Sequence, residues 1–129
     1  MIKGLDHAAV VVKDIERSIK FYCEVLGLEL NYDGRADGGR KLSFLGSEKE
    51  SFIALEEDRR RGKDEGAVQA LDHLAFAVDD VEEAQRTLKA RGVNFLWERV
   101  DGDGKAKSYY FKDPDGLELE VYGPIKKKR

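Results

Sequence analysis

The feature that most constrains the fold is an internal repeat at a constant offset of 66 residues, the separation of His7 and His73. Residues 5–14 read LDHAAVVVKD and residues 71–80 read LDHLAFAVDD, so six of ten positions are identical. The two histidines are the only ones in the 129-residue chain. Because duplicated segments adopt the same local structure, the sequence predicts two copies of one module.

Both copies show the same succession of hydrophobic patterns. Short apolar runs at 7–13 and 73–79 are typical of buried strands. Each run leads to a capping aspartate, an apolar stripe with helical spacing and a terminating glycine: Asp14 to Gly27, and Asp80 to Gly92. Three more strands are predicted in each copy, at 28–33, 40–46 and 51–57, and at 94–99, 106–112 and 117–122. The predicted fold class is α+β, with two tandem βαβββ modules.

The modules span residues 1–57 and 71–123. Between them, residues 58–70 carry alternating blocks of charge, which predicts a solvated linker. Residues 124–129 form a basic tail. Each module alone is too small to bury a stable core, so we expect both to belong to one domain.

Composition excludes several functional classes. The formal net charge of −3 gives no overall attraction to nucleic acid. The longest apolar run, Ala8–Val12, is too short to span a bilayer, so no membrane partner is expected. The single cysteine, Cys23, lies on an apolar helical stripe and predicts an inert core thiol in a reducing compartment. We therefore expect a cytoplasmic protein.

The repeated histidines suggest a metal centre. Alternation along a strand places His7 with Ala9, and His73 with Ala75, on faces lined by small side chains. A pseudo-twofold relation between the modules would bring both histidines to one place. In the last strand Glu118 and Glu120 share the face opposite the leucines, where a carboxylate is unfavourable unless it is paired or ligating. Two imidazoles and one carboxylate leave coordination positions open, as in catalytic sites.

Two further features surround this last strand. Pro114 and Gly116 predict a tight turn that joins it to the strand at 106–112. Either Tyr109 or Tyr110 would then face the ion, and the sequence of the turn leaves that choice open.

Several motifs together resemble the vicinal-oxygen-chelate superfamily. They are Gly4-Leu5-Asp6-His7, Ser18 to Tyr22 with Leu26-Gly27, Leu71-Asp72-His73, and Asp113-Pro114-Asp115-Gly116. The superfamily includes glyoxalase I, fosfomycin-resistance enzymes, extradiol dioxygenases and bleomycin-binding proteins. The resemblance implies a cupped mixed sheet and a homodimer. It also implies one divalent ion (Mn, Fe, Zn, Co or Ni) on His7, His73 and Glu120, with Tyr110 as the catalytic residue.

The chain departs from the four-ligand members of the superfamily. Those members take another carboxylate from the last strand of the first module, where the matching residue is Ala54. Glu56 has the same strand parity and becomes the candidate if the register slips by two. The departure favours epoxide-opening enzymes or extradiol dioxygenases over a glyoxalase lyase.

Each of the two favoured enzyme classes also has a functional residue that this chain lacks. Lys107 and Ser108 resemble the anion-contacting strand of fosfomycin-resistance enzymes, but Ala9 replaces their hydroxyl residue. The dioxygenases need a third histidine, which this chain does not have. We expect a metal enzyme acting on a small oxygenated substrate, and the alternative is a metal-free ligand-sequestering protein of the bleomycin-resistance type. The resemblance implies these substrate-contacting residues: Ala9, Lys107, Ser108, Tyr109 and Tyr122.

Overall fold

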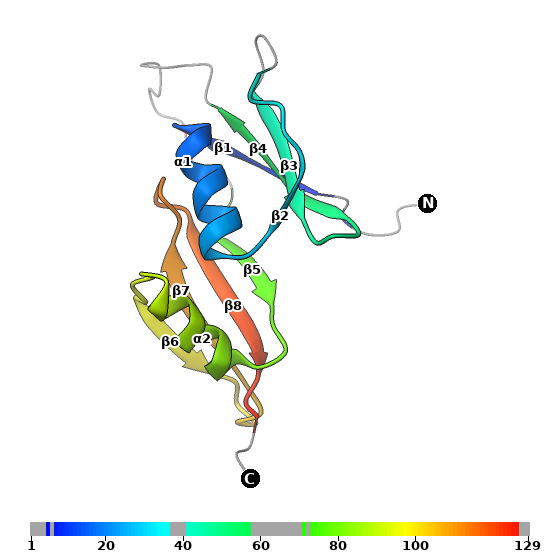
Figure 1. The fold of residues 1–129 in the computed structure, drawn as a ribbon. Helices are drawn as coiled ribbons and strands as arrows, with labels where there is room; N and C mark the ends of the chain where they lie inside the picture. The colour runs from blue at the N-terminus through cyan, green and yellow to red at the C-terminus, as the bar shows by residue number, and fades with distance from the viewer. Residues whose placement is uncertain (1–4, 6, 37–40, 58–70, 72, 127–129) are drawn as a thin grey trace. The chain divides into compact units, whose positions relative to one another are not determined.

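The computed structural model describes residues 5, 7–36, 41–57, 71 and 73–126. The chain divides into two compact units, Met1–Ala67 (unit 1) and Val68–Arg129 (unit 2) (Figure 1). The predicted linker at 58–70 and the end of the basic tail lie outside the described residues. No helix in the described part of the chain is long and apolar enough to cross a membrane.

The described part of unit 1 contains a mixed sheet and a helical segment. Its elements are β1 (Ala8–Val12), α1 (Ile15–Lys20), the π-helical η1 (Phe21–Val25), β2 (Glu29–Tyr32), β3 (Leu42–Gly46) and β4 (Ser51–Glu57). The sheet order is β1-β4-β3-β2, in which β1 runs parallel to β4 and the other pairs are antiparallel. The parallel pair requires a crossover, which the helix supplies.

Unit 2 repeats this topology. Its elements are β5 (His73–Ala77), α2 (Val81–Ala90), β6 (Trp97–Val100), β7 (Ala106–Lys112) and β8 (Glu118–Pro124). The sheet order is β5-β8-β7-β6, with β5 parallel to β8 (Figure 1). The predicted α+β class with two βαβββ modules is therefore confirmed.

In each unit the core lies between one face of the sheet and the helix. In β1, Val10 and Val12 are 6% and 1% exposed, whereas Val11 between them is 55% exposed. In unit 2 the apolar side of β8 is buried in the same way, including Leu119 and Val121, and α2 packs against β7 and β8. Strand alternation therefore leaves the opposite face of each sheet for other groups.

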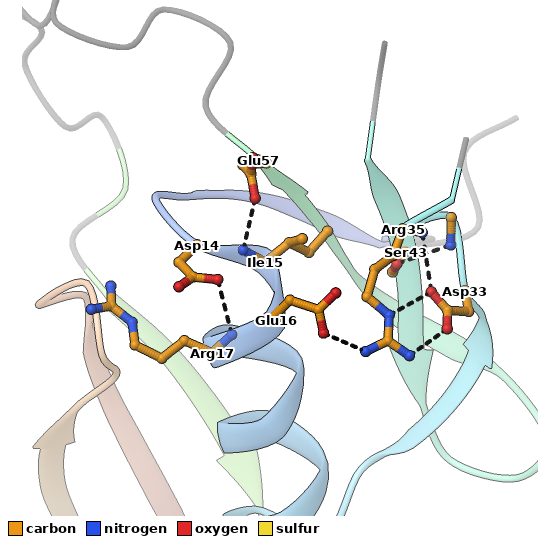
Figure 2. A network of polar contacts seen from close by, with 9 residues as sticks. Asp14, Ile15, Glu16, Arg17, Asp33, Arg35, Ser43 and Glu57 are labelled. Carbon is orange, nitrogen blue, oxygen red and sulfur yellow. Dashed lines mark hydrogen bonds and ion pairs between the residues drawn. The ribbon is translucent and has the colours of Figure 1, made fainter. Parts of the chain in front are cut away.

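Side-chain acceptors cap both helices as the sequence predicts. The Asp14 carboxylate accepts a hydrogen bond from the Arg17 N–H at 3.2 Å, and Asp80 accepts from the Glu83 N–H at 3.2 Å. Figure 2 shows a second acceptor at α1, because Glu57 at the end of β4 accepts from the Ile15 N–H at 3.1 Å. These bonds satisfy N–H groups that a helix leaves without partners in its first turn.

The first helix does not continue as one regular α-helix. From Phe21 the backbone becomes π-helical, and the Leu26 N–H donates to the Phe21 carbonyl at 3.2 Å. Gly27 then ends the segment with a φ of 80°, and Gly92 ends α2 with a φ of 94°. Glycine adopts these left-handed conformations at little cost, which explains both predicted helix ends.

Arg35, which follows β2, is bound to the first turn of α1. Its guanidinium donates to Glu16 at 2.8 Å and forms a two-pronged contact with Asp33 (Figure 2). The neighbouring Gly34 N–H donates to the buried Ser43 hydroxyl at 3.1 Å. The hydrogen bonds from Arg35 lower the pKa of Asp33 to about 2.

Candidate metal centre

Glu120 and His73 lie together on the open face of the unit 2 sheet. In the parallel β5–β8 pair Glu120 is opposite Ala75, which lies two residues after His73 on the same face of β5. The Oε1 atom of Glu120 is 3.2 Å from Nε2 of His73. Glu120 is only 6% exposed. A carboxylate this buried requires partners, and His73 is the first of two.

The second partner of Glu120 is Ser108 of β7. The Ser108 hydroxyl donates to Oε2 of Glu120 at 2.6 Å, and Ser108 is fully buried. Each carboxylate oxygen therefore has its own neighbour: an imidazole on one side and a hydroxyl on the other. This arrangement fixes the orientation of the carboxylate.

Tyr110 lies on the same face, and the strand register settles which tyrosine does so. Tyr110 is opposite Glu120 in the β7–β8 pair and opposite Trp97 in the β6–β7 pair. Its ring stands edge-on to His73, with centroids 6.2 Å apart, and stacks on Trp97 at 3.7 Å. Tyr110 is 5% exposed. It is thus held between the His73–Glu120 pair and an exposed indole.

Lys107 and Tyr109 alternate with these residues and face α2 instead. The Tyr109 hydroxyl donates to Glu82 at 2.7 Å, and the Lys107 ammonium lies 3.3 Å from Glu82 and 2.7 Å from Glu98. Burial raises the pKa of Tyr109, and the bond to Glu98 raises the pKa of Lys107. The structure does not bring either residue to Glu120.

The next row of the sheet adds Tyr122 and Arg99. Tyr122 lies opposite Ser108 on the face of Glu120, and its hydroxyl donates to Asp101 at 2.6 Å. That hydrogen bond raises the pKa of Tyr122. Arg99 of β6 also lies opposite Ser108, so it places an exposed cation on this face. The sequence does not predict Arg99 or Trp97 at this site, because only the β6–β7 register shows which face they share.

Unit 1 carries His7 on the equivalent face with different neighbours. The exposed His7 ring stands edge-on to Phe44 with centroids 5.6 Å apart. Ala54 lies opposite both Ala9 and Phe44. Ala54 and Phe44 therefore hold the positions that Glu120 and Tyr110 hold in unit 2, as the offset of the repeat predicts. Glu56 lies opposite Val11, two residues further along β4.

Comparison with known proteins identifies the family. Residues 4–121 match the family described as the Glyoxalase/Bleomycin resistance protein/Dioxygenase superfamily. The chain belongs to this superfamily. The match covers both modules and every strand except the last residues of β8.

Individual members of the superfamily are similar over nearly the whole chain. The metallothiol transferase FosB of Staphylococcus epidermidis is 32% identical over 124 residues, covering 95% of this chain and 84% of the relative. The uncharacterized protein YaeR of Escherichia coli is 32% identical over 126 residues, with 94% and 96% covered.

A solved structure of a fosfomycin-resistance protein shows the same fold. FosX of Listeria monocytogenes, in a mutant form complexed with Mn(II) and a dihydroxypropylphosphonic acid, aligns with a TM-score of 0.70 and 27% identity. The alignment covers 95% of this chain and 90% of that chain. The superfamily therefore includes metal-binding relatives of this chain.

The donor atoms of unit 2 fit such a metal. An imidazole nitrogen and a buried carboxylate oxygen are ligands that divalent transition ions accept, and they lie 3.2 Å apart. Among the residues that the structure describes, no three His, Cys, Asp or Glu side chains gather closely enough to hold an ion. Unit 2 supplies two candidate donors, and His7 belongs to unit 1. The full set of three ligands remains a prediction.

Proposed function

We propose that this protein is a divalent-metal-dependent enzyme that binds a small oxygenated substrate at a centre formed by His7, His73 and Glu120. The observation that carries the proposal is the buried Glu120 carboxylate, aligned by Ser108 and adjacent to His73. His7 completes the set through its equivalent place in the repeat. The ion would be Mn, Fe, Zn, Co or Ni.

His7, His73 and Glu120 would hold the ion, which when bound would supply Lewis-acid stabilisation of negative charge on a substrate oxygen. The residues of the chain then have separate tasks. The Tyr110 hydroxyl lies on the same face as Glu120 and is suited to donate a hydrogen bond or a proton to the substrate. The exposed guanidinium of Arg99 is suited to orient an anionic group, because it presents several N–H donors in a fixed plane.

These features favour nucleophilic ring opening of a small anionic oxygen compound, such as an epoxide. Arg99 supports an anionic substrate, and the relative FosB is named as a metallothiol transferase. Ala54 argues against the glyoxalase lyase reaction, since a fourth carboxylate ligand is absent from that position. Ring cleavage of the dioxygenase type is less favoured, because the chain has no third histidine.

Elemental analysis of the purified protein by plasma mass spectrometry tests the proposal. After dialysis, we expect close to one transition ion per chain in the unmodified protein. His73→Ala should lose that ion while keeping its fold by circular dichroism. Glu118→Gln is the matched control, because Glu118 lies opposite His73 in the β5–β8 pair and is outside the proposed ligand set.

The opposite result supports the alternative function. If the unmodified protein contains no metal and takes up none on titration, a metal-free ligand-sequestering protein becomes the better description. Unchanged uptake by His73→Ala would instead show that the ion is held elsewhere.

We also propose that the protein is a homodimer and acts in the cytoplasm. The single cysteine agrees with a reducing compartment. Sedimentation equilibrium would establish the oligomeric state, and a mass equal to that of one 14.6 kDa chain would contradict the dimer.

A further inference from the structure

We propose that Ser108 is a positioning residue that holds Glu120 so that one carboxylate oxygen, Oε1, is presented to the metal. This inference rests on the proposed metal-dependent function. It differs from the expectation based on the sequence, in which Ser108 contacts the substrate.

The hydrogen bond itself is the main support. At 2.6 Å between Oγ and Oε2 it is a short bond to a charged acceptor, a class about twice as strong as a neutral bond. A serine hydroxyl can donate one hydrogen bond, and here it donates that bond to Glu120. Ser108 therefore cannot also donate to a substrate while this bond is present.

Burial strengthens the assignment. Ser108 has no exposed surface and Glu120 is 6% exposed. A substrate would have to displace surrounding side chains to reach the Ser108 hydroxyl. Within such a poorly solvated site, a carboxylate oxygen without its hydroxyl partner would be strongly disfavoured.

The sheet makes the pair rigid. Ser108 lies opposite Tyr122 in the β7–β8 pair, so it is the diagonal neighbour of Glu120 on the same face. β7 lies between β6 and β8 in the sheet. Both residues are thus on internal strands, which hold side chains more firmly than loops do.

The two carboxylate oxygens then have different tasks. Oε2 is held by Ser108, whereas Oε1 faces Nε2 of His73 at 3.2 Å. Oε1 and Nε2 are consequently the two atoms arranged to share an ion. Loss of the Ser108 hydroxyl would free the carboxylate to rotate and would lower the affinity for the ion. Removal of a partner of this kind typically lowers metal affinity about 10- to 100-fold.

Isothermal titration calorimetry with Mn(II) on the full chain tests the proposal. We expect Ser108→Ala to raise the dissociation constant for Mn(II) about 10- to 100-fold. Ser108→Thr retains the hydroxyl and should recover most of the affinity. Ser43→Ala is the matched control, since Ser43 is also a fully buried serine, in β3, where it accepts a hydrogen bond from Gly34.

Each result is decisive. Ser108→Ala with the affinity of the unmodified protein overturns the positioning role, and so does an equal loss in Ser43→Ala. If Ser108→Ala does not fold, failure of a folded Ser108→Thr to bind Mn(II) better than a His73→Ala variant overturns it. If the unmodified chain binds neither Mn(II) nor any of the other proposed ions, the proposed function is overturned as well. An unchanged affinity in Ser108→Ala overturns the positioning role alone, so the two failures are distinguishable.

Discussion

Glu120 and Ala54 occupy equivalent positions in the two sheets. Glu120 lies opposite Ala75 in the β5–β8 pair, and Ala54 lies opposite Ala9 in the β1–β4 pair. One module therefore presents a carboxylate where the other presents a methyl group. The duplicated fold has been kept in both halves, but the side chains around the two histidines have diverged.

This asymmetry predicts which glutamate binds the ion. Glu120→Gln should lose the metal almost completely in elemental analysis, because an amide is neutral and a poorer ligand than a carboxylate. Glu56→Gln should keep close to one ion per chain, since Glu56 is displaced by two residues from the position equivalent to Glu120. An equal loss in both variants would instead indicate four protein ligands.

Most of the fold could be predicted because the chain contains the pattern twice. The predicted strand at 106–112 coincides with β7 (Ala106–Lys112). The predicted strand at 94–99 is observed later, as β6 (Trp97–Val100). Phe95 precedes β6, and its ring packs against Tyr109 and Phe111, with centroids 5.5 Å apart in each pair. An apolar residue at this position therefore reflects a tertiary contact, although in the sequence it looks like part of a strand.

The candidate centre could be predicted only in part. The repeat and the terminal strand predict a glutamate near His73, and the family resemblance selects Glu120 over Glu118. Strand alternation separates Lys107 and Tyr109 from Ser108 and Tyr110, but it does not show which set faces α2. That choice depends on the register of the β7–β8 hairpin.

The turn that sets this register should be important for stability. Asp113 is 5% exposed, and its Oδ1 atom accepts from the Asp115 and Leu117 N–H groups at 2.8 and 2.9 Å. Asp113→Ala would remove both acceptors and should lower the free energy of unfolding by about 2 to 4 kcal/mol in urea titrations. Asp103→Ala is the control, because Asp103 caps the Lys105 N–H in an exposed loop and should matter much less.

Asp33 should titrate at unusually low pH. The hydrogen bonds from Arg35 lower its pKa from an ordinary value of 3.8 to about 2. Because the folded-state pKa is the lower one, this contribution to stability is present above about pH 4 and is lost as the pH falls toward 2. The effect should be small, since the pair is exposed to solvent.

Carboxyl-carbon NMR titration measures this directly. Arg35→Gln should return the pKa of Asp33 toward 3.8. Arg86→Gln, which changes an arginine of α2 in the other unit, should leave it unchanged. A normal Asp33 titration in the unmodified protein would show that the contact with Arg35 does not persist in solution.

Trp97 should report on Tyr110 and on the metal, because it is the only tryptophan in the chain. Tyr110→Leu exposes the stacked face of the indole, so the fluorescence emission should shift to longer wavelength. Tyr109→Leu is the matched control, since Tyr109 lies on the opposite face and contacts Glu82.

Co(II) should quench the fluorescence of Trp97 in the unmodified protein but not in His73→Ala. The ion would bind at Glu120, which lies in the same row across the sheet as Tyr110 and Trp97. Equal quenching in both proteins would mean that Co(II) does not bind at the His73–Glu120 pair.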